Sequence, residues 1–482
     1  MKKKVLIVGG GVSGLCCGIQ CQKYGYETMI LEKTNSLGGN LTGWFRNDCY
    51  IDNCLHWLNG SLENTHLNYL FKEVGAIDKN TQFHQGEYFY VSEHNKKRIG
   101  LNVDLSITEK EMKSACPEDI KEINKFIKAM KLCLKLFESK SKLSSLSCFL
   151  SLLSIYKRKT LFEVAENCNS QLLKNFFTDY ILGEYSIYVL IFAYASFLQK
   201  DAKVPKDGSL CMAKRISEKY ESLGGKFLTN VEIEKAEIKD NKILFLKAKN
   251  DEEFSADYYI FACDAMTTFS KLLGKRFIPK KLLKTFNDRK NYPLISSFHI
   301  AYDINLDKLN IPDAFCFDCS PITIGVSQYN RLMIRNYDYG INYAPSGHSV
   351  LQVFLLQREN DYDYFASLSK KEYNEEKKKI TQIITEIIIN RFPQFKDKIT
   401  PLDCWTPLTY THYFNAYKGS YLCFGITKKF RLKSLSAKIP NCENGFLATQ
   451  WQRVFGGVPN AMKEGINCAK TIYLKDINSV VQ

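Results

Sequence analysis

The stretch that decides the fold is KVLIVGGGVSG, Lys4 to Gly14, in which an apolar run leads directly into closely spaced glycines. A short, nearly continuous apolar run is typical of a parallel strand that is buried on both faces. Residues 15–24 can then form a helix. This order of strand, glycine turn and helix predicts the first half of a dinucleotide-binding βαβ unit.

The glycines of this turn have separate physical roles. Gly9 permits the tight turn, Gly11 lets the backbone approach a pyrophosphate, and Gly14 lets the helix pack against the strand. The amino terminus of the helix, at Val12 and Ser13, offers unpaired N–H groups to the phosphates. We therefore expect all five residues to contact the cofactor.

A carboxylate stands where the ribose of the nucleotide is expected. A second strand, 27–31, ends at Glu32, which can accept hydrogen bonds from ribose hydroxyls. NAD alone would also satisfy this pattern, so the next residues decide between the cofactors. Gly38 and Gly39, a second glycine pair, lie in a segment that resembles the one after the ribose carboxylate in FAD enzymes of the glutathione reductase and amine oxidase type. The resemblance implies FAD, with contacts from Lys33, Gly38, Gly39, Asn40, Leu41 and Thr42.

Further motifs are spread over nearly the whole chain: LGGNLTGW at 37–44, YIDNCLHWL at 50–58, PKDGS at 205–209, TPLTY at 406–410, QW at 450–451 and GGVPNA at 456–461. In this order they resemble the motifs of the phytoene desaturase and retinol saturase family, within the flavin amine oxidase superfamily. The chain departs from the family pattern at Asn53, Cys54, Asp207 and Thr449. Asn53, Cys54 and Thr449 flank the expected flavin, so these departures put the geometry of the site around the edge of the flavin in question.

The resemblance implies an α/β fold with a discontinuous, Rossmann-like FAD-binding domain and an inserted α+β substrate domain. Because the cofactor motifs occur at three places, we assign residues 1–70, 204–273 and 437–482 to the FAD-binding domain. Residues 71–203 and 274–436 are then the substrate domain. Helical spacing is expected at 120–137 and 370–391, and strands at 294–302 and 349–356.

Further cofactor contacts follow from the same resemblance. Val231 lies in a segment, 225–233, that looks like the family's strand on the adenine side, and Cys263 ends a strand near the cofactor. Trp451 is expected to cover the isoalloxazine or to fill the core. Gly457 and Val458 precede a helix expected over 460–474, which includes Met462 and whose positive end would face the flavin.

Redox chemistry on unactivated carbon needs little acid or base from the protein, because the flavin carries the hydride. We therefore expect that the reaction requires no catalytic triad. The sequence also contains no metal-ligand motif. His56 is the candidate catalytic residue: it would orient the substrate or transfer a proton, and a structural histidine is the alternative.

The leading hypothesis is oxidation or reduction of a carbon–carbon bond in a small apolar substrate of isoprenoid or polyene type. One alternative is oxidation of a C–N bond by an amine oxidase relative, which shares the cofactor motifs. Another is an isomerase that uses reduced FAD without net redox change. A relative with a decayed site that only binds flavin is the non-enzymatic alternative.

Length, charge and cysteine content bear on the number of domains, the binding partners and the cellular compartment. The 482 residues suggest two or three domains, and the formal charge of +15 is scattered, without the basic arm of a nucleic-acid-binding protein. Seventeen cysteines, an odd number, without a secretory segment favour reduced thiols in a cytoplasm. The richness in Lys, Asn and Ile resembles the residue usage of an AT-rich bacterium. Residues 140–159 form an apolar stretch bracketed by basic residues. We favour a helix that covers the substrate cavity, with peripheral contact at the inner face of a membrane as the alternative.

Overall fold

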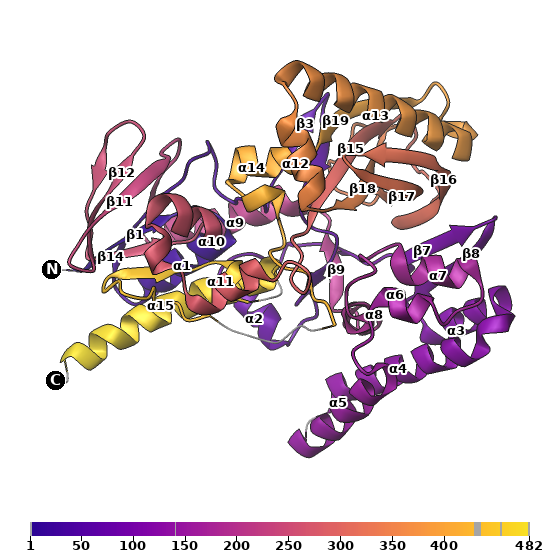
Figure 1. Ribbon diagram of the computed structural model, residues 1–482, viewed down its shortest axis with the longest axis horizontal. Coiled ribbons are helices and arrows are strands. Elements are labelled where there is room, and N and C mark those ends of the chain that lie inside the picture. Colours follow the sequence, from indigo (N-terminus) through magenta and orange to yellow (C-terminus); the bar gives the residue numbers. More distant parts are fainter. Residues whose placement is uncertain (1, 140, 429–434, 454–455, 481–482) are drawn as a thin grey trace.

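Two sheets organise the chain in the computed structural model, which describes residues 2–139, 141–428, 435–453 and 456–480. Figure 1 shows the sheets in separate halves of the molecule, with chain segments that cross between them. Sequence order does not follow this division, because the chain enters each half more than once.

The first sheet has five parallel strands in the order β10-β2-β1-β14-β20. Ile7 in the middle strand lies opposite Ile30 on one side and Ile260 on the other, and all three are fully buried. This explains why the strands are apolar without alternation. Their bounds are β1 Lys4–Val8, β2 Glu27–Leu31, β10 Lys226–Leu228, β14 Tyr258–Phe261 and β20 Gly445–Leu447.

Three helices pack together with this sheet: α1 (Val12–Lys23), α9 (Gly208–Ser222) and α15 (Val458–Val480). Helices α1 and α15 approach so closely that a Cβ on Gly465 would lie 2.2 Å from the carbonyl oxygen of Ser13. Helix α1 begins three residues before the predicted start, because Gly11 caps it and accepts the first helical bond from the Leu15 N–H.

A separate core cluster joins the sheet to the three-stranded antiparallel sheet β11-β12-β13 and to short helices. The bounds are β11 Ile233–Lys239, β12 Lys242–Ala248, β13 Glu253–Phe254, α10 Ala265–Thr267 and α11 Lys280–Asn287. The prediction of a strand through Val231 is wrong. Asn230 adopts a left-handed conformation, with φ of 59°, which ends the extended run between β10 and β11. Val231 instead donates its N–H to the carbonyl of Glu32 at the end of β2.

The second sheet has seven strands in the order β19-β15-β18-β17-β16-β7-β8, antiparallel except for the parallel pair β7 and β16. Its strands come from both inserted segments, which meet at that pair. One face is covered by α13 (Lys370–Arg391), which buries Ile380, Ile384 and Ile388 at helical spacing. The strand bounds are β7 Tyr88–His94, β8 Lys97–Asn102, β15 Ser296–Ile304, β16 Ala314–Ile324, β17 Ser327–Asn336, β18 Ser349–Gln357 and β19 Ile399–Trp405.

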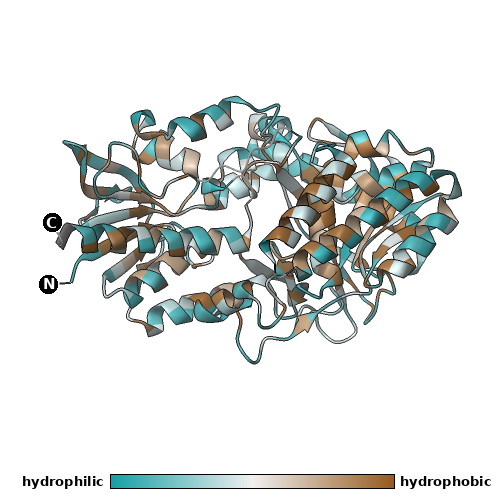
Figure 2. Ribbon diagram, turned by 90° about the horizontal axis from the view of Figure 1, so that it is seen from below, coloured by the Kyte–Doolittle hydropathy of each residue, from teal (hydrophilic) through white to brown (hydrophobic). Residues whose placement is uncertain are grey.

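A layer of helices accompanies this sheet and shares a core with its β7–β8 end. In Figure 2 hydrophobic residues gather on the helices at the right, the side that α3 to α8 and the large sheet occupy in Figure 1. The helices are α3 Leu105–Ala115, α4 Ile120–Glu138, α5 Lys142–Tyr156, α6 Leu161–Ala165, α7 Gln171–Thr178 and α8 Ile187–Leu198.

Short elements connect the two halves. They are β3 Gly43–Arg46, β4 Cys49–Asp52, β5 Leu58–Asn59, α2 His66–Glu73, β6 Phe83–His84, β9 Ala202–Pro205, α12 Glu359–Ser367 and α14 Pro407–Phe414. Among the described helices, none combines the length and the apolar character that crossing a bilayer requires. The predicted α/β fold with an α+β insertion is thus confirmed, and the predicted helices and strands of the insertion form within two residues of their expected ends.

Candidate active site

A cavity of about 1720 Å³ runs from the glycine turn of the parallel sheet to helices α5 and α8 of the other half. Single small-molecule sites usually enclose roughly 300–1,000 Å³. The cavity therefore has room for a dinucleotide at one end and a second, elongated ligand at the other.

The glycine turn is shaped by backbone contacts that exclude side chains. Gly9 has φ of +102°, and a Cβ on Gly14 would lie only 2.0 Å from the carbonyl oxygen of Gly9. By contrast, a Cβ on Gly11 would meet its nearest protein atoms, in Gly38 and Gly39, at 3.9 Å, an ordinary van der Waals distance, and Gly11 lines the cavity wall. Gly14 is therefore a packing residue, whereas the open side of Gly11 is a cradle for a ligand.

Glu32 and the second glycine pair complete this end of the cavity. The Gly10 N–H donates to Glu32 Oε2 at 2.7 Å, and Thr34 donates its N–H and hydroxyl to Glu32 Oε1, both at 2.9 Å. The Gly38 N–H donates to the Gly10 carbonyl at 2.8 Å, and a Cβ on Gly39 would lie 3.1 Å from Gly11 Cα. The glycine turn, the segment at Glu32 and the second glycine pair thus form one cradle, whose free space a side chain would fill. The shape and donors of this cradle fit the pyrophosphate and ribose of a dinucleotide.

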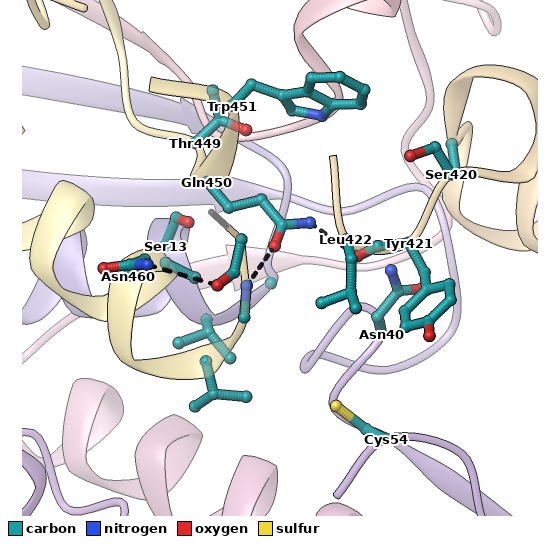
Figure 3. A pocket seen from close by; sticks show the side chains of 18 of the residues that line it. Ser13, Asn40, Cys54, Ser420, Tyr421, Leu422, Thr449, Gln450, Trp451 and Asn460 are labelled. Carbon is teal, nitrogen blue, oxygen red and sulfur yellow. Dashed lines mark hydrogen bonds between the residues drawn. The ribbon is translucent and has the colours of Figure 1, made fainter. Parts of the chain in front are cut away.

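The amino terminus of α15 reaches the same cavity. Gly457, with φ of +98°, donates its N–H to Gln450 Oε1 at 2.9 Å, and Gln450 Nε2 donates to the Tyr421 carbonyl at 2.9 Å. Figure 3 shows Gln450 between these two partners, with Asn460 bonded to the Gly456 carbonyl beside it. The cavity is therefore lined by the amino-terminal, electropositive ends of both α1 and α15.

The predicted site residues divide into cavity-lining residues and supports. Trp451 lines the cavity, but its ring also stacks on Phe286 at 5.2 Å and meets Phe424 edge-on at 5.0 Å. Gly14, Thr42 and Met462 do not line the cavity, and Met462 is fully buried in the core behind it. The other predicted residues that line it are Gly9, Gly11, Val12, Ser13, Glu32, Lys33, Gly38, Gly39, Asn40, Leu41, His56, Val231, Cys263, Gly457 and Val458.

Charged groups line the nucleotide end of the cavity. Lys33 Nζ donates to the His412 carbonyl at 2.7 Å and to Asn415 Oδ1 at 2.9 Å, and burial lowers the pKa of its ammonium group. Asp264, which the sequence did not single out, accepts from the N–H groups of Thr267 and Tyr417. Burial raises the pKa of Asp264 to about 6.

The opposite end of the cavity is aromatic and aliphatic. Two members, Trp57 and Tyr410, belong to the sequence motifs, and residues 140–159 were expected to cover the cavity, but the other members come from distant segments and share no spacing that would predict them. They include Trp57, Phe137, Phe149, Leu153, Tyr180, Tyr185, Tyr188, Val189, Phe192, Ile295, Phe354, Leu356, Tyr410 and Tyr421.

His56 lies at this end, on the cavity wall. Its ring meets Phe354 edge-on at 4.5 Å, and its backbone carbonyl accepts a hydrogen bond from Arg335 Nη2 at 3.2 Å. Burial, and then the charge of Arg335, hold the pKa of His56 well below its usual range. Burial likewise lowers the pKa of His299, which also lines the cavity, to about 3. Both imidazoles are therefore neutral near pH 7.

Asn53, at which the chain departs from the family pattern, hydrogen-bonds to residues at both ends of the cavity. Asn53 Nδ2 donates to the Asn40 carbonyl at 3.2 Å, and Asn53 Oδ1 accepts from the Tyr410 hydroxyl at 3.3 Å. Tyr410 also lies 3.2 Å from both His299 Nε2 and the Ser297 hydroxyl. The larger residue at position 53 therefore ties the second glycine segment to the substrate end.

Comparison with known proteins places these features in context. The family model described as flavin containing amine oxidoreductase matches residues 12–473. Prolycopene isomerase 2, chloroplastic, from an Oncidium hybrid cultivar is 24% identical over 86% of this chain and 74% of its own length. The inactive all-trans-retinol 13,14-reductase of Danio rerio is 21% identical over 97% of this chain and 85% of its own length.

Solved structures share the fold at low sequence identity. An oxidoreductase from Methanosarcina mazei superposes with a TM-score of 0.62 at 13% identity, over 97% of this chain and 99% of the other. A putrescine oxidase with putrescine bound gives a TM-score of 0.60 at 12% identity, over 98% and 99%.

Proposed function

The chain belongs to the family of flavin-containing amine oxidoreductases, and we propose that this FAD-dependent oxidoreductase acts on carbon–carbon bonds of an apolar, polyene-like substrate. The observation that carries the proposal is the long aromatic and aliphatic end of the cavity, directly beyond the nucleotide cradle. An extended apolar molecule would bury its surface there, at about 25 cal/mol for each Å² removed from water.

The residues that would hold FAD follow from the cradle. The turn Gly9–Gly14 and the amino terminus of α1 would hold the pyrophosphate, Glu32 would bind the ribose, and the start of α15 would face the flavin end. Bound FAD supplies or accepts the hydride. The protein itself orients the substrate, keeps water from the apolar end of the cavity, and provides for the accompanying proton.

Two observations argue against oxidation of an amine. Tyr410 and Tyr421 stack with centroids 5.6 Å apart and planes inclined by 25°, so the space between the rings is closed to an amine. The charge of Arg335 lies next to His56 and Tyr180 on the cavity wall, and it would repel a substrate ammonium.

We also propose that the protein works in the cytoplasm and touches the inner face of the membrane through α5. Leu143, Leu146 and Leu150 are 83%, 57% and 57% exposed, whereas Phe149 and Leu153 of the same helix line the cavity. Within 140–159, the basic flanks are Lys142, Lys157, Arg158 and Lys159, and Lys140 falls outside the described residues. Such a helix suits an anionic lipid surface and would let an apolar substrate enter from the bilayer. It combines the two alternatives predicted for this segment.

Product mass tests the reaction. The holoenzyme is incubated anaerobically with prolycopene or all-trans-retinol, once with FAD oxidised and once with FAD reduced. A product two hydrogen atoms lighter or heavier supports the proposal. A product of unchanged mass that forms only with reduced FAD would instead identify an isomerase, the second candidate, which the similarity to prolycopene isomerase favours.

A further inference from the structure

Two arginines on β17, Arg331 and the more deeply buried Arg335, differ in their partners. Arg331 forms ion pairs with Asp179 at 2.5 Å and with Asp318 at 2.6 Å. Arg335, four residues further along the strand and only 3% exposed, has no carboxylate within 4.0 Å among the residues that the structure describes. Burying an arginine without a counter-ion destabilises the folded state, so its position calls for a functional reason.

Two hydrogen bonds of Arg335 point toward the cavity: its Nη1 donates to the Tyr180 hydroxyl at 3.3 Å and its Nη2 donates to the His56 carbonyl at 3.2 Å. Its guanidinium also lies 5.9 Å from the centre of the Tyr337 ring, and Nε has no hydrogen-bond partner among the described residues. Both partners line the substrate end. The positive charge of Arg335 therefore acts on the cavity wall through its hydrogen bonds to Tyr180 and to the backbone of His56.

Tyr180 is set apart from the other cavity tyrosines by this contact. Its hydroxyl accepts a hydrogen bond from Arg335, so its own proton remains available to a group in the cavity. Tyr188 donates instead to the carbonyls of Leu152 and Leu153, and Tyr410 donates to Asn53. Among the residues that the structure describes, no arginine hydrogen-bonds to Tyr185.

The orientation of Tyr180 is fixed by packing. Its ring stacks on Tyr90 at 4.9 Å and contacts Phe89 at 5.1 Å and Trp57 at 5.8 Å. Burial raises the pKa of the Tyr180 hydroxyl, and Arg335 opposes that effect by favouring the phenolate. The two neighbouring imidazoles, His56 and His299, are neutral and cannot serve as imidazolium acids near pH 7.

We propose that Tyr180 is the proton donor in the reduction of a carbon–carbon double bond, and that Arg335 is its positioning residue. This inference rests on the proposed function and adds a direction to it. One carbon receives the hydride that reduced FAD supplies. The adjacent carbon receives the Tyr180 proton, so the O–H bond and the π bond break and two C–H bonds form. The phenolate is stabilised by Arg335 until it takes a proton from solvent.

The charge also favours reduction over oxidation. Removing a hydride from an apolar chain leaves a carbocation, which an uncompensated guanidinium nearby would destabilise. Adding a hydride places negative charge on the chain, which the same guanidinium would stabilise.

The first test measures the acidity of Tyr180 without any substrate. The FAD-loaded protein is labelled with 3-fluorotyrosine, whose phenol ionises in a milder pH range, and ¹⁹F resonances are assigned from their loss in Tyr180→Phe and Tyr185→Phe. Tyr180 should ionise at least about one pH unit below Tyr185, a tenfold difference in acidity. In Arg335→Met the difference should disappear, and in Arg335→Lys it should persist in part. Equal titration of Tyr180 and Tyr185 in the unmodified chain overturns the inference, even if the arginine variants fail to fold.

The second test follows oxidation of the reduced holoenzyme by prolycopene or all-trans-retinol. Tyr180→Phe should lower the maximal rate by about 10²–10⁴-fold with the FAD spectrum and KM unchanged, whereas Tyr69→Phe, at a 56% exposed tyrosine of α2 outside the cavity lining, should remain near the unmodified rate. Full activity of Tyr180→Phe overturns the inference and leaves the proposed function intact. If neither polyene is reduced, the proposed direction fails, while the titration still decides whether Arg335 activates Tyr180.

Discussion

The two ends of the cavity are built from different parts of the chain. The nucleotide end is made mainly of backbone: glycine turns, helix amino termini and one carboxylate, held by N–H to oxygen bonds. The substrate end is made of side chains, largely aromatic, from segments far apart in the chain. A backbone site is specified by a few glycines and tolerates almost no added atoms. A side-chain site can be reshaped by substitution while the fold persists.

The largest effect is expected where this difference is sharpest, at Gly14. Because a Cβ there would meet the Gly9 carbonyl oxygen at 2.0 Å, Gly14→Ala should prevent correct packing of α1, and the protein should be recovered unfolded and without FAD. Gly11→Ala is the matched variant, since its Cβ meets no protein atom closer than 3.9 Å. It should fold normally by circular dichroism and bind FAD at least tenfold more weakly, a loss of about 1.4 kcal/mol. Equal FAD affinity of Gly11→Ala and the unmodified chain would contradict the cradle.

The buried carboxylate next to Asn53, which holds the wall of the cavity in place, should be almost as sensitive to substitution. Asp52 is 2% exposed and accepts from the Ser209 N–H and hydroxyl, at 2.7 and 2.6 Å, and from the Cys54 N–H at 2.9 Å. Asp52→Asn should lower the free energy of unfolding by about 2–4 kcal/mol, because it replaces several charge-assisted bonds.

Chemical denaturation measures that loss. The control is Asp104→Asn, at an exposed helix cap where Asn serves equally well, and it should change stability by less than about 0.5 kcal/mol. Similar effects of the two substitutions would show that Asp52 does not anchor the wall of the cavity.

The outer face of the substrate end should accept change without loss of fold. Leu143→Glu with Leu150→Glu should leave thermal unfolding unchanged and reduce co-sedimentation with anionic vesicles at least tenfold, since each buried leucine contributes about 1.5–3 kcal/mol. The matched control is Leu283→Glu on α11, which is 42% exposed on the other half. If the α5 variant still sediments with vesicles of phosphatidylcholine and phosphatidylglycerol, α5 is not the membrane contact.

The last effect is confined to acidic pH and concerns a charge at the nucleotide end. The pKa of Asp264 is raised from 3.8 to about 6, so the folded state prefers the protonated form, and its contribution to stability is lost as pH rises from about 4 through 6. The unfolding free energy of the FAD-free protein should therefore fall by about 2–3 kcal/mol over this range relative to Asp264→Asn. Parallel pH profiles of the two proteins would refute the assignment.

The same contrast explains what could be predicted from the sequence. The parallel sheet, the glycine turn and Glu32 were predictable, because backbone roles leave glycines and a carboxylate at fixed spacing. Val231 was placed in a strand wrongly, since the left-handed Asn230 carries no strong local signal. Arg335, Tyr180 and His299 were not predictable as neighbours, because tertiary packing alone brings β17, β15 and the segment after α7 together.

The most direct test of the account is which substrate exchanges electrons with the bound FAD. Anaerobic stopped-flow absorption would follow the reduced holoenzyme mixed with a conjugated polyene, and the oxidised holoenzyme mixed with putrescine. The account predicts that the polyene restores the oxidised flavin spectrum and that putrescine leaves that spectrum unchanged. Rapid bleaching of the oxidised flavin by putrescine, with no reaction of the polyene, would contradict it.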